Sequence, residues 1–133
     1  MNYAEELKKY NLKVTPQRVA IVQELYLFGH LNIDQLYTKL LNQFPSISLA
    51  TIYKNMNAMI ERIFIQEVKI PHEKSVYELS KASHAHVVCE KCKKIEDIMI
   101  STQGVLEEVK EKSSFSITNS AMVFSGICSE CSK

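Results

Sequence analysis

Four cysteines are the residues of this 133-residue chain whose type and spacing point most directly to chemistry. They form two Cys-x-x-Cys pairs, Cys89/Cys92 and Cys128/Cys131, and each such turn can aim two thiolates at one ion. Two turns complete the tetrahedron that zinc prefers, although the 35 residues between the pairs exceed usual zinc-ribbon spacing. Thioredoxin-like redox chemistry or inert buried thiols are the alternatives, but neither pair opens a helix after a strand. The pattern therefore predicts a structural zinc site.

Imidazoles and carboxylates supply a second possible set of ligands, free of sulfur. His84 and His86 are two residues apart, so that on a strand both rings project from one face. His30 after a helix, Glu78 at the end of a strand, and Asp97 could complete a mixed nitrogen and oxygen site. Such ligands suit Fe²⁺, Mn²⁺, Zn²⁺, Co²⁺ or Ni²⁺.

Simpler roles remain open for the histidines. A histidine that follows Gly29 can act as a cation at the C-terminal end of a helix, and a His-x-His pair alone is a weak metal motif. His72, inside a predicted hairpin, can be a solvated residue or a phosphate contact.

The composition is that of a globular protein, with 46% hydrophobic and 23% charged residues and only three glycines and three prolines. Apolar runs such as residues 63–65 are far too short to span a bilayer, and the first residues lack the apolar stretch of a signal peptide. We therefore expect a cytoplasmic protein. The net charge is +1. Residues 1–81 carry ten basic and eight acidic side chains, a slight excess of positive charge that is compatible with DNA binding.

Helix periodicity followed by strand alternation characterises the N-terminal part of the chain. Helices are expected over residues 3–10, 16–28, 33–44 and 49–63. Their predicted N-caps are Thr15, Asn32 and Ser48, their predicted stops Gly29 and Pro45, and Tyr26 and Leu49 are placed on their apolar faces. Alternating strands over 64–70 and 75–79 then form a hairpin. The last three of these helices, followed by the hairpin, are typical of a winged helix-turn-helix.

The pattern changes from residue 83 onwards. Strands are expected over 84–88 and 94–100, a helix over 104–113 with Val105, Leu106 and Val109 inward, and a long strand over 115–127. This tail of about fifty residues is too small to be stable without a metal or a partner chain. We predict an α+β protein, with a winged helix-turn-helix domain over residues 1–80, a small α/β domain over 81–133 and a hinge near 80–83.

Four segments, taken in order and spacing, resemble the ferric uptake regulator superfamily of bacterial metal-dependent repressors: LKVTPQR, PSISLATIYKN, HAHVVCEKCKKIEDI and GICSECSK. The resemblance extends over nearly the whole chain. It implies that residues 1–80 bind double-stranded operator DNA and that the zinc-stapled residues 81–133 form a homodimer. The implied protein is not an enzyme and has no membrane partner and no small-molecule ligand beyond metal and peroxide.

The resemblance also implies a regulatory Fe²⁺ or Mn²⁺ ion at the hinge, beside the structural Zn²⁺ of the cysteines. Its ligands match His30, Glu78, His84, His86 and Asp97. An ion that takes ligands from both domains binds a closed form better, and only such differential affinity shifts a population. A further site of the family is implied to be absent, because its positions carry Ala85, Gly104 and Ser120.

The kind of signal follows from two acidic positions. Asp97 is the residue typical of the peroxide-responsive branch, in which bound iron leads to oxidation of a ligating histidine, and His30 and His84 match the oxidised positions. Glu78 departs from this branch, which usually has aspartate there. The resemblance therefore favours a peroxide sensor, with an iron-, zinc- or manganese-level sensor of the same family as the alternative.

For DNA, the resemblance makes the helix over 49–63 the recognition helix of the major groove. Tyr53 and Lys54 match base-reading positions, and Lys13 matches a minor-groove contact. Contacts to phosphates or base edges are further expected from Arg18, Ser48, Thr51 and Asn55. Ser48 can instead serve only as a helix cap.

Two other classes of protein remain as alternatives. Histidines with a carboxylate also serve non-haem iron oxygenases, but no stretch of this sequence marks a substrate pocket. A passive zinc-ribbon interaction module would need the cysteines alone.

Overall fold

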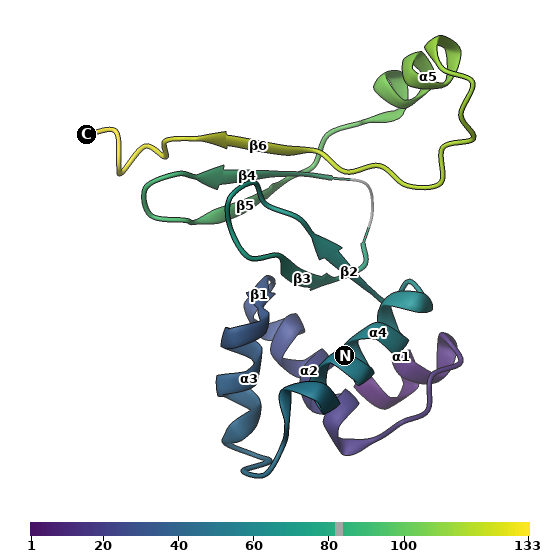
Figure 1. Cartoon of the computed structure of the whole chain (residues 1–133), viewed down its shortest axis with the longest axis vertical. Coiled ribbons are helices and arrows are strands. Elements are labelled where there is room, and N and C mark those ends of the chain that lie inside the picture. Colours follow the sequence, from purple (N-terminus) through teal and green to yellow (C-terminus); the bar gives the residue numbers. More distant parts are fainter. Residues whose placement is uncertain (82–83) are drawn as a thin grey trace. The chain divides into compact units, whose positions relative to one another are not determined.

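The computed structural model describes residues 1–81 and 84–133, which form two compact units, Met1–Ser80 and Lys81–Lys133 (Figure 1). Part of the expected hinge, residues 82 and 83, lies outside the described residues. The predicted α+β fold, a winged helix-turn-helix followed by a small α/β unit, is confirmed. Within the described parts of the chain, no helix is long and apolar enough to cross a membrane.

Side-chain caps start all four helices of the first unit, α1 (Tyr3–Lys9), α2 (Pro16–Phe28), α3 (Ile33–Leu41) and α4 (Leu49–Glu61). The predicted caps Thr15, Asn32 and Ser48 each accept a hydrogen bond from a backbone N–H of the first turn. Gly29 ends α2 with a φ of 80°, a conformation that glycine adopts without strain. α3 ends at Leu41, three residues earlier than predicted. The backbone N–H groups of Asn42 and Gln43 donate to the carbonyls of Lys39 and Leu40, three residues back instead of the four of an α-helix.

The hairpin of β2 (Ile65–Val68) and β3 (Val76–Leu79) gains a third strand that the sequence did not predict. This strand, β1 (Leu31–Asn32), pairs antiparallel with β3, so that the sheet order is β1-β3-β2. Leu31 lies opposite Tyr77, and continuing that register by one residue brings His30 beside Glu78. The missed strand thus explains how two distant residues of the first unit meet.

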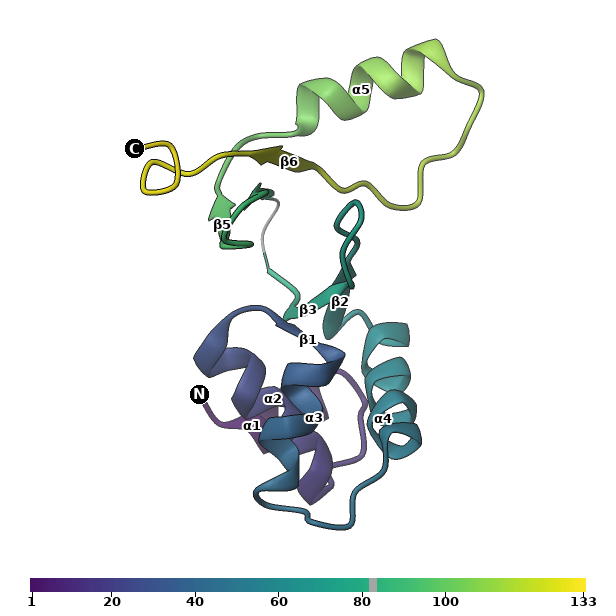
Figure 2. The same ribbon diagram turned by 60° about the vertical axis from the view of Figure 1, so that its left-hand side comes forward.

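The hydrophobic core of the first unit lies between its helices and the sheet (Figure 2). Its fully buried side chains include Leu7, Ile21, Leu25, Leu36, Leu40, Ile52, Met56 and Met59. Tyr26 and Leu49 are instead 52% and 41% exposed, contrary to prediction. Tyr26 packs edge-on against Tyr3 at the rim, and Leu49 is the first residue of α4, so both sit at the margins of their apolar faces.

The second unit is a three-stranded sheet with one helix, and it buries little. β4 (Ala85–Cys89) is the central strand, with β5 (Ile95–Ile98) antiparallel and β6 (Val123–Gly126) parallel to it. The predicted strand over 115–127 is thus only four residues long. Helix α5 (Gln103–Lys112) has no buried residue, and Val105 and Val109 are 50% and 44% exposed, so their predicted inward placement is wrong within one chain. In both views α5 stands off the sheet (Figures 1 and 2).

Candidate metal centres and nucleic-acid surface

The four cysteines gather at one end of the sheet of the second unit. Cys89 ends β4, and because β6 runs parallel to β4, the chain leaves both strands at the same edge, where Cys128 follows. All four Sγ atoms lie within 4.8 Å of one another, and the Sγ atoms of Cys92 and Cys128 are 3.8 Å apart. Sulfurs about 2.3 Å from a tetrahedral zinc would be separated by roughly 3.8 Å. The cluster therefore has the donor set and the size of a Cys₄ zinc site.

Electrostatics in this cluster also favour a cation. The backbone N–H groups of Cys92 and Cys128 donate to the sulfur of Cys89 and lower the pKa of its thiol to about 6. The neighbouring sulfur of Cys128, followed by burial, raises the pKa of Cys131 to about 12. Sulfurs this close cannot all carry charge without a counter-ion, and a divalent metal would displace the remaining protons.

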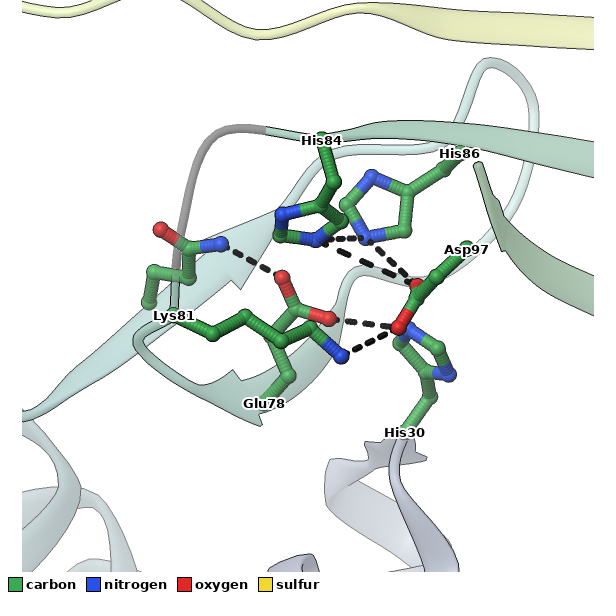
Figure 3. Close-up of polar contacts among 7 residues, drawn as sticks. His30, Glu78, Lys81, His84, His86 and Asp97 are labelled. Carbon is green, nitrogen blue, oxygen red and sulfur yellow. Dashed lines mark hydrogen bonds and ion pairs between the residues drawn. The ribbon is translucent and has the colours of Figure 1, made fainter. Parts of the chain in front are cut away.

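A second group of ligand atoms converges on the other part of this sheet. His86 on β4 lies directly opposite Asp97 on β5, with its Nε2 3.4 Å from the Asp97 Oδ1. The Nε2 of His84 is 3.1 Å from that of His86 and 3.9 Å from the same Asp97 oxygen. Both rings point toward this carboxylate in the close-up view (Figure 3). The prediction that the rings of His84 and His86 approach one point is therefore confirmed. We call His84, His86 and Asp97 the sheet triad.

In the first unit, the predicted ligands His30 and Glu78 form a pair. The Nε2 of His30 is 2.8 Å from Oε2 of Glu78, a buried carboxylate at the centre of β3 (Figure 3). The Glu78 Oε1 accepts a hydrogen bond from the amide of Gln66, the residue opposite it on β2. A buried carboxylate held in this way has a fixed direction, which is what a metal ligand requires.

Sequence reasoning missed two polar residues of these clusters. Gln66 could have been found, because the length of the hairpin turn sets which residue faces Glu78. Lys81, whose Nζ forms an ion pair with Asp97, carries no signal of its own, since it meets Asp97 only through the path of the chain after β3.

The predicted recognition helix, α4, exposes Tyr53 and Lys54 while Ile52 and Met56 anchor its opposite face in the core. Ser48 caps the helix, and its hydroxyl also lies 3.0 Å from that of Thr51. Ser48 therefore serves as the N-cap of α4, in addition to any contact with DNA.

Arg18 and Asn55, two of the predicted DNA-contacting residues, are hydrogen-bonded to each other. The Nε of Arg18 donates to Oδ1 of Asn55 at 3.0 Å, and its Nη1 donates to the carbonyl of Lys13. The Asn55 amide in turn donates to the carbonyl of Thr51. This chain of hydrogen bonds links α4 to the segment before α2, where the side chain of Lys13 is exposed.

Comparison with known proteins gives these clusters a context. The pattern that defines the Ferric uptake regulator family matches residues 9–125. The peroxide-responsive repressor PerR of Staphylococcus epidermidis is 32% identical over 127 residues, which cover 94% of this chain and 85% of that protein.

Solved structures of both sensor types resemble the chain. The peroxide stress regulator of Campylobacter jejuni is 34% identical with a TM-score of 0.73, over 98% of this chain and 100% of that one. The ferric uptake regulator of Vibrio cholerae is 29% identical with the same TM-score of 0.73, over 94% and 98%. A peroxide regulator and an iron regulator are thus similar to this chain to nearly the same degree.

Proposed function

Because the chain belongs to the ferric uptake regulator family, we propose that it is a metal-dependent repressor of transcription that binds operator DNA as a homodimer. The observation that carries this proposal is the sheet triad, which aims three ligand atoms at one place, separate from the Cys₄ group at the other end of β4. A sensor needs this separation, since the structural ion must stay while the regulatory ion exchanges. A repressor works where the chromosomal DNA lies, which places it in the cytoplasm.

The second copy would cover the apolar surface of the second unit. Val87 and Phe124 lie side by side on β4 and β6 and are 37% and 54% exposed. Further exposed apolar side chains of this unit are Ile98, Met99, Ile100, Val105, Val109, Phe115 and Ile127. So much exposed apolar surface on fifty residues is typical of an interface. Dimerisation through residues 81–133 would bury it.

We further propose that one Fe²⁺ or Mn²⁺ ion takes His30 and Glu78 together with the sheet triad as its ligands. The donor set is nitrogen and carboxylate oxygen without sulfur, which suits these ions, whereas the thiolates suit Zn²⁺. An ion shared between residues 1–80 and 81–133 would favour the arrangement of two domains that fits DNA.

Peroxide is the signal we propose. With iron bound, H₂O₂ would transfer one oxygen atom to an imidazole carbon of His30 or His84 and leave as water, a two-electron oxidation of the ring. Bound iron supplies the reactivity toward peroxide. An oxidised ring is a poorer ligand, so the ion and the DNA-binding arrangement would be lost together. The similarity to peroxide-responsive relatives and the presence of Asp97 support this choice.

The decisive experiment compares two metals. Zinc-loaded protein is given Fe²⁺ or Mn²⁺ without oxygen, its binding to a duplex selected from a random-sequence library is measured, and H₂O₂ is then added. We expect both metals to support binding, and only the iron form to release DNA and to gain one oxygen atom at His30 or His84, located by peptide mass spectrometry. An iron form that stays bound and unmodified would disprove peroxide sensing.

A metal-level sensor is the second candidate, favoured by Glu78 and by the similarity to the Vibrio cholerae regulator. In that case the metal that supports binding near its cellular concentration identifies the signal. Titration of Fe²⁺, Mn²⁺ and Zn²⁺ against DNA binding, without peroxide, separates the two candidates.

For DNA recognition we propose that Tyr53 and Lys54 read bases, that Lys13 enters the flanking minor groove and that Arg18 contacts a phosphate. Ser48, Thr51 and Asn55 would add contacts to phosphates or base edges. Lys54→Ala should then cost about 1–3 kcal/mol of binding free energy and relax the preference for one base pair. Lys8→Ala on α1 removes the same charge from an exposed site of the first unit and is the matched control. Equal losses in the two variants would mean that Lys54 contributes only general electrostatic attraction. Fluorescence anisotropy with single-base variants of the duplex measures both effects.

A further inference from the structure

Asp97 of the sheet triad has two different neighbours on its two oxygens. Its Oδ1 faces the rings of His86 and His84, at 3.4 Å and 3.9 Å from their Nε2 atoms. Its Oδ2 forms an ion pair with the Nζ of Lys81, which reaches the carboxylate from the first residue of the second unit (Figure 3). The Asp97 carboxylate, which is proposed to bind the regulatory metal, is therefore already paired with a positively charged side chain of the same protein.

We propose that Lys81 is a tethered competitor of the regulatory ion: its ammonium holds the Asp97 carboxylate in the metal-free protein and weakens the binding of a divalent ion there. The inference rests on the proposed function, since it concerns the same site. In consequence, Lys81 sets the metal concentration at which the protein responds.

Charge decides the direction of this effect. A lysine beside a ligating carboxylate can orient it by a hydrogen bond, which would strengthen metal binding. It also brings a positive charge next to the incoming cation, beside two imidazoles that are almost fully buried. Repulsion between full charges at this range exceeds the gain from orienting one oxygen.

The side chain is suited to leaving when the metal arrives. Lys81 is 40% exposed, so its flexible stem can carry the ammonium into water without crossing a packed interior. A lysine ammonium is a compact and strongly hydrated charge, which is stable once released. An arginine at this position would grip the carboxylate through two parallel hydrogen bonds and be harder to displace.

Three variants of the full chain test the proposal. Lys81→Gln removes the charge and keeps a hydrogen-bond donor, and Lys81→Met removes both at similar length. Lys110→Gln, on the exposed face of α5 in the same unit, changes the net charge equally and is the control. Zinc-loaded protein is titrated with Mn²⁺ in competition with a chelator of known affinity.

Both Lys81 variants should bind Mn²⁺ about tenfold more tightly than the wild type, while Lys110→Gln stays within about twofold. The Mn²⁺ concentration at half-maximal DNA binding should fall by the same factor. If Lys81→Met binds Mn²⁺ more weakly and Lys81→Gln does not, Lys81 orients Asp97 and the proposal is wrong. Unchanged affinity in both variants also overturns it. A wild-type protein that takes up no Mn²⁺ beyond its zinc would instead refute the proposed function, and the competitor with it.

Discussion

Cys128→Ser should remove the tightly bound zinc and unfold the second unit while leaving the first unit folded. The reason lies in how little the second unit buries: among its described residues only Ala85, His86, Val88 and Cys89 are buried. Such a core cannot offset the conformational entropy of some fifty residues. The first unit, by contrast, has its own core between four helices and a sheet.

The size of the effect follows from what zinc contributes. Binding of zinc by four thiolates is worth on the order of 10 kcal/mol in small zinc-dependent domains, where it is the free energy of folding. Serine replaces a soft thiolate by a hydroxyl that zinc binds poorly, so most of this contribution is lost. Self-association should be lost as well, because the apolar surface proposed to form the dimer lies on the unit that unfolds.

Elemental analysis, sedimentation and circular dichroism together check this prediction. The variant should contain no tightly bound zinc, sediment as a monomer and keep a helical signal from the first unit. Glu130→Gln, between Cys128 and Cys131, alters the same loop without removing a sulfur and should behave as the wild type. A Cys128→Ser protein with a full equivalent of zinc and an unchanged unfolding curve would show that this cysteine is no ligand.

Local chemistry explains which parts of the fold could be predicted from the sequence. Thr15, Asn32 and Ser48 were identifiable as caps because a short polar side chain that satisfies the N–H groups of a first turn acts within three residues. The hairpin was identifiable because its strands alternate and are joined by a short turn. The Cys₄ group was identifiable because two Cys-x-x-Cys turns supply the four thiolates of one tetrahedral site.

The errors occur where an element depends on a distant partner. β1 is two residues long and exists only because β3 pairs with it, so no local pattern marks it. Val105 and Val109 have the spacing of a buried face, yet both are about half exposed in a single chain. Periodicity identifies an apolar face, but it does not say whether the same chain or a second copy covers it.

His86→Ala should abolish the dependence of DNA binding on Mn²⁺. The imidazole of His86 is almost fully buried, lies opposite Asp97 and touches His84, so its loss removes the central member of the sheet triad. The coupling between an effector and DNA is typically worth a factor of about 5–150 in affinity. If Mn²⁺ no longer binds, the ratio of DNA affinities with and without Mn²⁺ falls to one. Only an ion that binds one state of the protein better than the other can shift their populations.

Two further variants keep this prediction testable. His86→Gln retains a polar side chain of similar size, so a loss of metal dependence in both variants cannot be ascribed to a cavity in the sheet. His72→Ala, at the exposed tip of the hairpin, should leave the ratio of affinities with and without Mn²⁺ intact even if it weakens both. All three proteins should keep one equivalent of zinc, since the cysteines lie at the other end of β4. If the ratio survives in His86→Ala, the regulatory ion does not use the sheet triad, and the sensor must lie elsewhere.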